Sequence, residues 1–175
     1  RFEGQDVRGG KATPAQPGIR APLIANWPGV IAGGQTCSDL IDASDFVPTL
    51  AQLAQCEIPA DWRSDGLSFA PRLIGSEPKP REWCFFWYDP RPGWDKERFS
   101  RHIFALDHEF KLFSDGRLFD IRGTGFREIE LDPNQLSESA RAARQKLEQA
   151  INESMKPPIS AAASKLVDAH GERID

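Results

Sequence analysis

Residues 110–121, FKLFSDGRLFDI, carry the clearest structural signal in this sequence. Asp115-Gly116 is a pair typical of a tight hairpin turn, because glycine readily adopts the left-handed backbone that such turns need. The segments on either side, 109–113 and 118–121, are rich in aromatic and branched residues, which favour strands. The stretch therefore predicts two antiparallel strands joined by a short turn.

The sequence predicts two more strands before this hairpin and one helix after it. Residues 83–88, WCFFWY, and residues 101–106 are predicted strands by their aromatic and apolar content. Short strands joined by short turns form an antiparallel meander, here of four strands. The helix begins either at residues 132–135 or at Ser137. Its apolar stripe, expected to lie on the meander, is Leu136, Ala140, Ala143, Leu147 and Ile151.

The first part of the chain has a different character. Residues 1–34 are rich in glycine and proline, which predicts a long wrapping loop. Within it, the apolar residues 22–26 lie between prolines and predict a short buried strand. Residues 42–55 predict a helix, and residues 70–75 predict one further helical turn. The expected apolar face of the first helix is Phe46, Val47, Leu50, Leu53 and Ala54.

Composition excludes several classes of protein. The chain has 175 residues, a formal net charge of −4 and 39% hydrophobic residues, so it has enough apolar material for a core. It has no basic run, which argues against a nucleic-acid partner, and no apolar stretch near the ~20 residues that span a bilayer, so no membrane partner is expected. It has no visible signal peptide and no initiator methionine, Met155 being its only Met, so we expect a portion of a longer chain.

No complete catalytic motif is visible. Cys37, Cys56 and Cys84 form no CxxC pair, and we expect three buried or half-buried thiols. The histidines lack metal-ligand spacing, and the sequence contains neither a nucleophile elbow nor a phosphate loop. The residues alone therefore indicate an α+β domain without a complete active site.

The order of short motifs is more informative than any one of them. The sequence contains, in this order, GGKAT at 9–13, GIRAPLI at 18–24, WPG at 27–29, DFVPTL at 45–50, DGLS at 65–68, LIG at 73–75, FKLF at 110–113, DGRLFDI at 115–121 and DP at 132–133. Each fragment is a weak signal by itself. Together, over residues 9–133, they resemble the second half of sulfatases, which belong to the alkaline-phosphatase-like superfamily.

This resemblance implies a reaction and its cofactors. Sulfatases hydrolyse sulfate esters with a formylglycine made from the Cys or Ser of a C/S-x-P-x-R motif, and a calcium ion orients the sulfate. No cysteine or serine of this chain begins that motif. The resemblance therefore implies that the nucleophile and the metal ligands lie upstream of Arg1. It also implies a C-terminal portion of a sulfatase, inactive by itself and without metal ligands of its own.

One residue of this chain matches a sulfatase active-site residue. Lys11, after Gly9 and Gly10, matches the loop lysine that contacts the sulfate, because glycines let an ammonium approach an anion closely. A lone GGK is more often a solvated surface lysine, but the order of motifs favours the sulfate contact. The family's glutamate falls at Gln16 and its first glycine at Pro17, so Arg20 lacks a potential carboxylate partner.

Other residues are weaker candidates. Arg91 and Trp94 lie on a proline-stiffened loop and could reach the leaving group of a substrate, although a plain strand connection is the simpler reading. His102 is expected to be a strand residue, with a substrate contact as the alternative. Arg20 is expected to anchor a loop, and Asp45 or Ser44 to cap the helix.

The expected architecture has three parts. Residues 1–80 would form the edge of the sulfatase catalytic α/β domain, and residues 81–156 an antiparallel-sheet subdomain covered by a helix. Residues 157–175 would be a tail. The strand at residues 22–26 would lack sheet neighbours in this chain, which predicts exposed apolar surface and a possible homo-oligomer.

Two other functions stay open. A phosphonate or phosphodiester hydrolase of the same superfamily handles an anion of similar charge and geometry. A non-catalytic interaction domain could also retain the sheet and the helix. Localisation is unknown from the residues; the resemblance implies a periplasmic, secreted or lysosomal protein with a sulfate-ester substrate.

Overall fold

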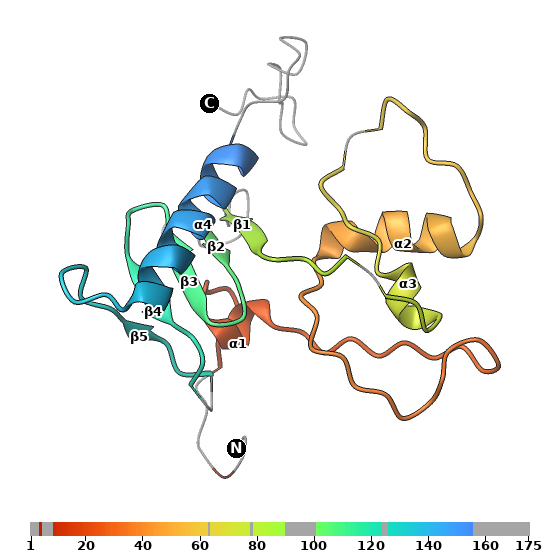
Figure 1. Cartoon of the computed structure of the whole chain (residues 1–175), viewed down its shortest axis with the longest axis horizontal. Helices are drawn as coiled ribbons and strands as arrows, with labels where there is room; N and C mark the ends of the chain where they lie inside the picture. The colour runs from red at the N-terminus through yellow and green to blue at the C-terminus, as the bar shows by residue number, and fades with distance from the viewer. Residues whose placement is uncertain are drawn as a thin grey trace.

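A computed structural model describes residues 4, 9–62, 64–77, 79–89, 101–123 and 126–155. In these ranges the chain is α+β, with a five-stranded antiparallel sheet in the order β1-β2-β3-β4-β5 (Figure 1). Each strand pairs with the next one along the sequence, so the sheet is a meander. The strands are Cys84–Tyr88 (β1), His102–Leu106 (β2), Phe110–Phe113 (β3), Leu118–Asp120 (β4) and Ile129–Glu130 (β5).

The hairpin between β3 and β4 is the one that Asp115-Gly116 predicts. Leu112 lies opposite Leu118, and the amide of Phe113 donates to the carbonyl of Arg117 at 3.0 Å. Gly116 has a φ of +91°, a backbone conformation that side chains disfavour. The turn prediction is therefore confirmed.

The expectation of four strands is wrong by one. Ile129–Glu130 forms β5 and pairs with β4, with Phe119 opposite Glu130. Both residues of β5 are exposed, so the strand has no buried face. A segment this short has no readable alternation, and its place in the sheet depends on pairing with β4.

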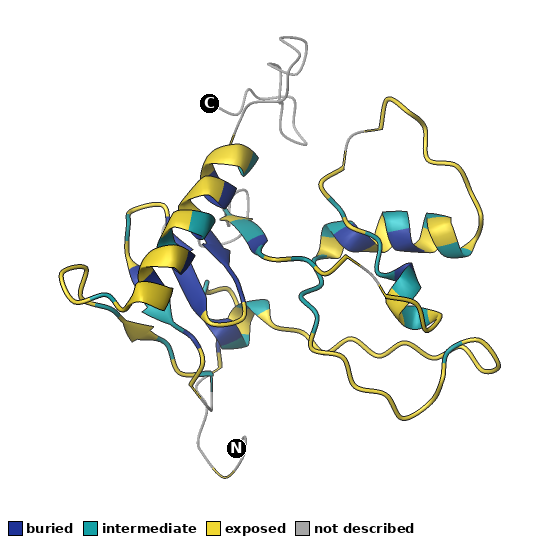
Figure 2. Cartoon of the chain, in the orientation of Figure 1, coloured by how far each residue is buried: buried dark blue, intermediate teal, exposed yellow. Residues whose placement is uncertain are grey.

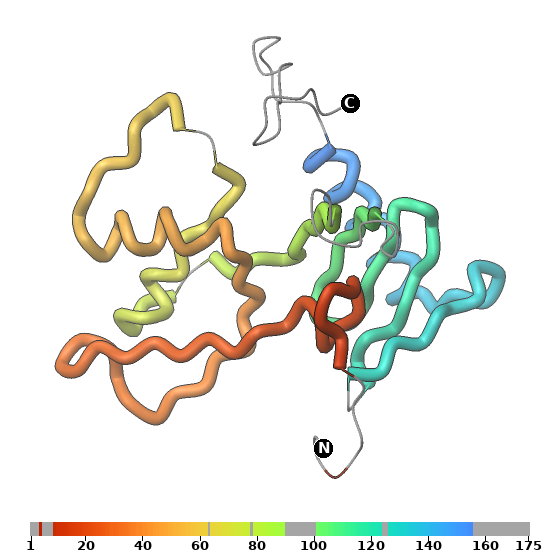
Figure 3. The backbone as a smooth tube through the Cα atoms, turned by 180° about the vertical axis from the view of Figure 1, so that it is seen from behind, coloured from red at the N-terminus to blue at the C-terminus, as the bar shows by residue number. Residues whose placement is uncertain are grey.

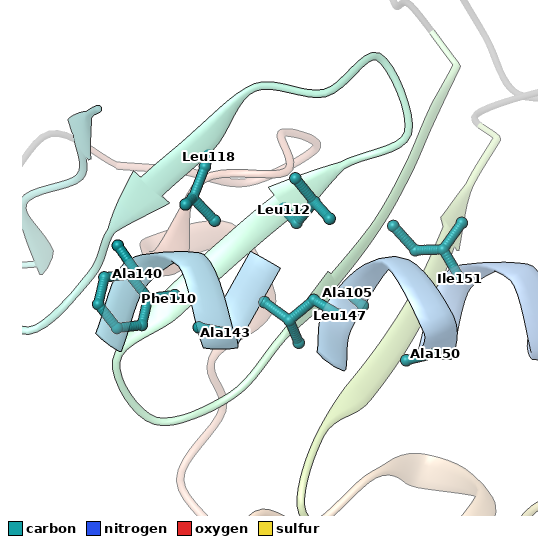
Figure 4. Packing of buried hydrophobic residues seen from close by; sticks show 9 residues of the cluster. All are labelled: Ala105, Phe110, Leu112, Leu118, Ala140, Ala143, Leu147, Ala150 and Ile151. Carbon is teal, nitrogen blue, oxygen red and sulfur yellow. The ribbon is translucent and has the colours of Figure 1, made fainter. Parts of the chain in front are cut away.

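Helix α4, Glu138–Ser154, lies across one face of the sheet (Figure 4). It begins after Ser137, whose hydroxyl accepts a hydrogen bond from the amide of Ala140 at 3.1 Å. Of the two starts that the sequence allowed, Ser137 is therefore correct. The buried residues between α4 and the sheet are Ala105, Phe110, Leu112, Leu118, Ala140, Ala143, Leu147, Ala150 and Ile151.

The opposite face of the sheet has a second apolar cluster. It consists of Cys84, Phe104, Leu106, Phe113 and Ile121. The short helix α1, Gln16–Ile19, lies against this face, and Ile19 packs on the cluster. Figure 3 shows α1 and α4 on opposite sides of the strands. The helix α1, within the segment that was expected to be a loop, thus packs on the face that α4 leaves open.

The remaining helices lie apart from the sheet in Figure 1. They are the 3-10 turn η1, Ala43–Asp45, and the α-helices α2, Phe46–Leu53, and α3, Ala70–Leu73. The apolar face that was expected on α2 is open to solvent: Leu50 is 61% and Val47 51% exposed. Thr49 is the buried residue of α2. Figure 2 shows that most of this part is exposed.

The buried strand expected at residues 22–26 is not formed. This segment has no strand partner among the described residues, and Ile24 is 88% exposed. A strand needs a neighbour to satisfy its backbone groups, and the described sheet, β1-β2-β3-β4-β5, does not include this segment. The exposed apolar surface that we expected on this account is present, and it includes Leu23, Ile24, Trp27 and Val30.

A buried ion pair joins the α2 part to the strand region. Arg81 donates to both carboxylate oxygens of Asp45, and the Asp45 carboxylate also accepts the amide of Leu67 at 2.6 Å. The expected capping role is corrected: the side chain of Asp42 caps η1 by accepting from Ser44, and Asp45 takes the reciprocal place in this capping box. Asp45 is therefore structural, as expected, but through a wider set of contacts.

The cysteines differ from the expectation. Cys37 and Cys56 are exposed, and only Cys84 of the three is buried. Cys37 and Cys56 lie in irregular segments outside the apolar clusters, which is why their burial was predicted wrongly. Burial raises the pKa of the Cys84 thiol to about 12, so it has almost no reactive thiolate near neutral pH.

This contrast predicts selective alkylation. At about pH 8, iodoacetamide should modify Cys37 and Cys56 in the folded chain, and Cys84 only after denaturation, because the thiolate is the nucleophile. Peptide mapping by mass spectrometry measures each site. Equal labelling rates at all three cysteines would contradict the burial of Cys84.

Candidate functional site

The segment of residues 9–20, here called the lysine loop, is closely folded. A Cβ on Gly10 would lie 2.5 Å from the nitrogen of Gly18, and a Cβ on Gly18 would lie 2.1 Å from the oxygen of Gly10. Neither position can carry a side chain without moving the backbone. The amide and the hydroxyl of Thr13 both donate to the carbonyl of Gly10, at 3.0 and 2.7 Å. The glycines are therefore needed for the shape of the loop.

The residue after the lysine has an uncommon conformation. Ala12 has a φ of +60°, which places it in the left-handed region that non-glycine residues rarely adopt. Its carbonyl accepts a hydrogen bond from the Tyr88 hydroxyl at 2.7 Å. Such a conformation persists when surrounding contacts hold it, and here β1 supplies one such contact.

Three further hydrogen bonds, at Pro14 and Gln16, tie the lysine loop to β3 and to residues next to β4 and β5. The Lys111 ammonium, on β3, donates to the carbonyl of Pro14 at 2.6 Å. The backbone amide of Gln16 donates to Glu128 at 2.8 Å, and its side-chain amide donates to the carbonyl of Ile121 at 3.3 Å. The loop is thus attached to the sheet at three successive places.

Lys111 is a buried cation at the centre of these contacts. Its side chain has no exposed surface, and its ammonium lies 2.9 and 3.0 Å from the two carboxylate oxygens of Glu128. It also lies 5.0 Å from the ring centre of Phe104 and 4.9 Å from that of Phe113. Burial lowers the pKa of Lys111, and the hydrogen bond to Glu128 opposes this shift.

The sequence analysis did not predict this pair. The sequence does indicate that Lys111 needs a partner, but it does not identify the partner. On β3, Phe110 and Leu112 belong to the cluster beneath α4, so Lys111 must point to the other buried face. A lysine on a strand that is buried on both faces needs a partner. The sequence does not show that this partner is Glu128, because the intervening residues give no pairing rule.

Lys11 itself is exposed, on the loop that these contacts hold. The structure therefore places it on an ordered loop with a free approach from solvent. An ammonium in this position can meet an anion that comes from outside the chain.

His102 begins β2 and contacts Phe113, on the face of the sheet where the lysine loop lies. Its ring stacks on Tyr88 with 6.2 Å between ring centres, and its edge meets Phe113 at 5.8 Å. Tyr88 is also the residue that holds Ala12 next to Lys11. His102 and the lysine loop are therefore linked through one tyrosine. Sequence reasoning named His102 but not Tyr88.

Arg91 and Trp94, the other expected contacts, lie outside the described residues. The described residues on either side of their segment are close together: the Nε of Arg101 lies 2.9 Å from a carboxylate oxygen of Asp89. Asp89 and Arg101 thus lie at the end of the sheet that contains Tyr88 and His102.

The two departures from the sulfatase pattern fit the structure. Pro17 lies in the first turn of α1, where its missing amide proton costs little. Gln16 is buried, and its side-chain oxygen has no hydrogen-bond partner among the described residues. The Arg20 guanidinium lies 5.8 Å from the ring centre of Phe126, so a ring contact is available to it as a loop anchor.

The described residues contain no group of three or more His, Cys, Asp or Glu side chains that could hold a metal ion. None of the helices described here is both long and apolar enough to cross a membrane. A pocket of about 230 Å³ lies beside the β3–β4 hairpin, away from the lysine loop. Its lining includes Asp115, Arg117, Glu130 and Arg144.

The fold and the loop together define an α+β domain in which a glycine-lysine loop is fixed on one face of an antiparallel sheet. Residues 11–163 match the family described as "N-sulphoglucosamine sulphohydrolase, C-terminal". The match covers well over half of the chain. The chain therefore belongs to this family of sulfatase C-terminal domains.

Individual relatives are sulfatases as well. The chain is 41% identical to arylsulfatase A of Homo sapiens over 100 residues, which is 57% of this chain and 18% of that protein. It is 41% identical to arylsulfatase A of Bos taurus over 81 residues, 46% of this chain and 16% of that protein. It is 44% identical to steryl-sulfatase of Rattus norvegicus over 68 residues, which is 39% of this chain and 12% of that protein. The chain thus spans less than a fifth of the length of these relatives.

Proposed function

We propose that this chain is the C-terminal part of an enzyme that hydrolyses sulfate esters, and that Lys11 contacts the sulfate. The observation that carries the proposal is the exposed Lys11 on a loop that Tyr88, Lys111 and Glu128 hold against the sheet. The names of the sulfatase relatives support the same reaction class.

The proposed role of Lys11 is electrostatic. A sulfuryl group in transfer spreads negative charge over its oxygens, and a fixed ammonium stabilises that charge. A preformed loop provides the cation without a reorganisation cost at the moment of reaction. The tethered conformation of the lysine loop supports this role, because hydrogen bonds hold the backbone on both sides of Lys11.

The proposed substrate edge includes His102 and the segment that contains Arg91 and Trp94. The stacking of His102 on Tyr88 supports a place near the lysine loop. In this proposal Arg91 and Trp94 meet the leaving group; the position of Asp89 and Arg101, which flank their segment in sequence, beside Tyr88 and His102 supports it.

Calcium and formylglycine belong to the intact enzyme in this proposal. Their residues would lie outside this chain, since none of its cysteines begins the required motif. The chain alone would therefore be inactive. The chemistry of the bound ion would be to orient the sulfate, and this chain would contribute the cation at Lys11.

The test compares the intact protein with the isolated chain on an aryl sulfate, in the presence of calcium. The proposal expects turnover by the intact protein and none by the chain. Parallel assays with an aryl phosphonate monoester and a phosphodiester should give lower kcat/KM. Turnover by the isolated chain, or a preference for either phosphorus ester, would overturn this assignment.

We further propose that residues 1–80 form an edge of the catalytic domain. In the intact protein, the open face of α2 would pack on the rest of that domain. In this chain Leu50 is 61% exposed, and Leu50→Ala at such a position changes the free energy of unfolding by less than about 0.5 kcal/mol. In the intact protein we expect a loss of about 2–5 kcal/mol, as for a buried leucine.

Leu147→Ala is the matched control, because Leu147 lies on α4 and is fully buried against the sheet. It should cost about 2–5 kcal/mol in the same denaturant titration of the intact protein. A neutral Leu50→Ala beside a destabilising Leu147→Ala would show that the α2 face stays open, and would reject the proposed edge.

A further inference from the structure

We infer that the Lys111–Glu128 ion pair is a positioning device that sets the place of Lys11, and thereby acts on the reaction without touching the substrate. This inference rests on the proposed function. It concerns two residues that are 17 positions apart in sequence and that both contact the lysine loop.

The ion pair forms hydrogen bonds with two different backbone groups of the lysine loop. The Lys111 ammonium donates to the carbonyl of Pro14, and the Glu128 carboxylate accepts the amide of Gln16. One charged pair therefore satisfies a donor and an acceptor on either side of Ala15. These contacts fix the part of the loop that follows Lys11 to β3 and to the segment before β5.

The surroundings of Lys111 make the arrangement specific. Its side chain is fully buried, and the rings of Phe104 and Phe113 lie within 5.0 Å of the ammonium. A buried ammonium must keep its hydrogen-bond acceptors, and here they are Glu128 and a carbonyl of the loop. Moving the loop would remove one of them. The cost of that loss holds the loop in place.

The second tether makes the positioning precise near the lysine. The Tyr88 hydroxyl holds Ala12, directly after Lys11, and Thr13 closes the turn back to Gly10. With Pro14 and Gln16 held by the ion pair, the backbone from residue 12 to residue 16 is attached at three points. Without the ion pair, the contact of Tyr88 with Ala12 and that of the Gln16 side chain with the carbonyl of Ile121 would remain, and the backbone between residues 12 and 16 would lose both of its charged partners.

The test uses the intact protein with Lys111→Met, which keeps the length of the side chain and removes its charge. We expect the amides of residues 11–13 to exchange hydrogen faster. We also expect kcat for an aryl sulfate to fall about tenfold to a hundredfold, because displacement of a catalytic group by about 1 Å has effects of this size. Inhibition by inorganic sulfate should weaken in parallel.

The double variant Lys111→Met/Glu128→Gln separates positioning from general stability. It leaves no lone buried charge, so much of the stability lost in Lys111→Met should return. The contact with Pro14 stays lost, so kcat should stay low. Recovery of kcat together with stability would overturn the inference and leave the pair a purely structural role.

Lys146→Met is the matched control. Lys146 forms an ion pair with Asp107 at 2.6 Å and belongs to α4, on the opposite face of the sheet. It should leave exchange at residues 11–13 and inhibition by sulfate unchanged. If Lys111→Met fails to fold, Glu128→Gln alone should show the same changes in smaller measure, because Gln can still accept from Gln16.

The two proposals can fail separately. Unchanged exchange at residues 11–13 in the variants of the pair would overturn the positioning role, whatever Lys11→Ala does. Faster exchange with unchanged kcat and unchanged sulfate inhibition would also overturn it, provided that Lys11→Ala lowers kcat. Normal turnover by Lys11→Ala would instead remove Lys11 from the reaction and overturn the proposed function.

Discussion

Lys11→Ala in the intact protein should lower kcat for an aryl sulfate by about a hundredfold to a thousandfold, the effect of losing one preorganised charge-stabilising group. The reason is that the negative charge on the sulfuryl oxygens would lose its fixed cation, while the loop keeps its shape. Lys11 makes none of the three attachments to the sheet, which come from Ala12, Pro14 and Gln16. The free energy of unfolding should therefore stay near that of the unaltered protein.

Lys79→Ala is the control for general charge effects, because Lys79 is exposed in the segment between α3 and β1. It should leave kcat unchanged. Lys11→Arg should retain part of the rate, since the charge remains but its geometry differs. A rate unaffected by Lys11→Ala would show that Lys11 is a solvated surface lysine.

Asp45→Ala should lower the free energy of unfolding by about 3–5 kcal/mol, the range for removing one partner of a buried ion pair. Asp45 is 2% exposed, and its carboxylate receives hydrogen bonds from Arg81 and from the amide of Leu67. The substitution leaves a buried guanidinium without its carboxylate. Denaturant titration monitored by circular dichroism measures the loss.

Asp39→Ala provides the comparison. Asp39 also pairs with an arginine, Arg72, at 2.8 Å, but the side chain of Arg72 is 42% exposed. Exposed ion pairs contribute little, so the change should be much smaller than for Asp45→Ala. Similar losses for the two variants would contradict the structural role that burial gives to the Asp45–Arg81 pair.

Local sequence signals predicted the β3–β4 hairpin and the buried face of α4. Asp115-Gly116 determines a turn within four residues, and the stripe that includes Leu147 repeats over several helical turns. Such signals depend on neighbours in sequence. Strand β5 was not predicted, because it is only two residues long and its conformation depends on pairing with β4.

The strand expected at residues 22–26 and the packing of the apolar face of α2 depend on partners that the described residues do not supply. Residues 22–26 and the apolar face of α2 have the composition of buried elements, yet both are exposed here. Hydrophobic pattern reports what a segment is suited to contact, not whether that contact is present in a given chain. Residue type alone predicted that Cys37 and Cys56 are buried or half-buried, and both are exposed outside the two apolar clusters.

In the candidate site, too, local motifs were readable from the sequence and long-range contacts were not. The order of motifs around Gly9-Gly10-Lys11 predicted a sulfate contact for Lys11, which stays a proposal. The contacts that hold this loop, from Tyr88, Lys111 and Glu128, come from distant positions and follow from the register of the meander. They required the structure because no local pattern pairs these residues.

The most direct test of the account is a crystal structure of the intact protein with bound inorganic sulfate. The account predicts the Lys11 ammonium within about 3 Å of a sulfate oxygen, the distance of a charge-assisted hydrogen bond. It also predicts that the contacts of Ala12 with Tyr88 and of Pro14 with Lys111 are retained. A sulfate bound at the catalytic centre with Lys11 directed away from it would contradict the account.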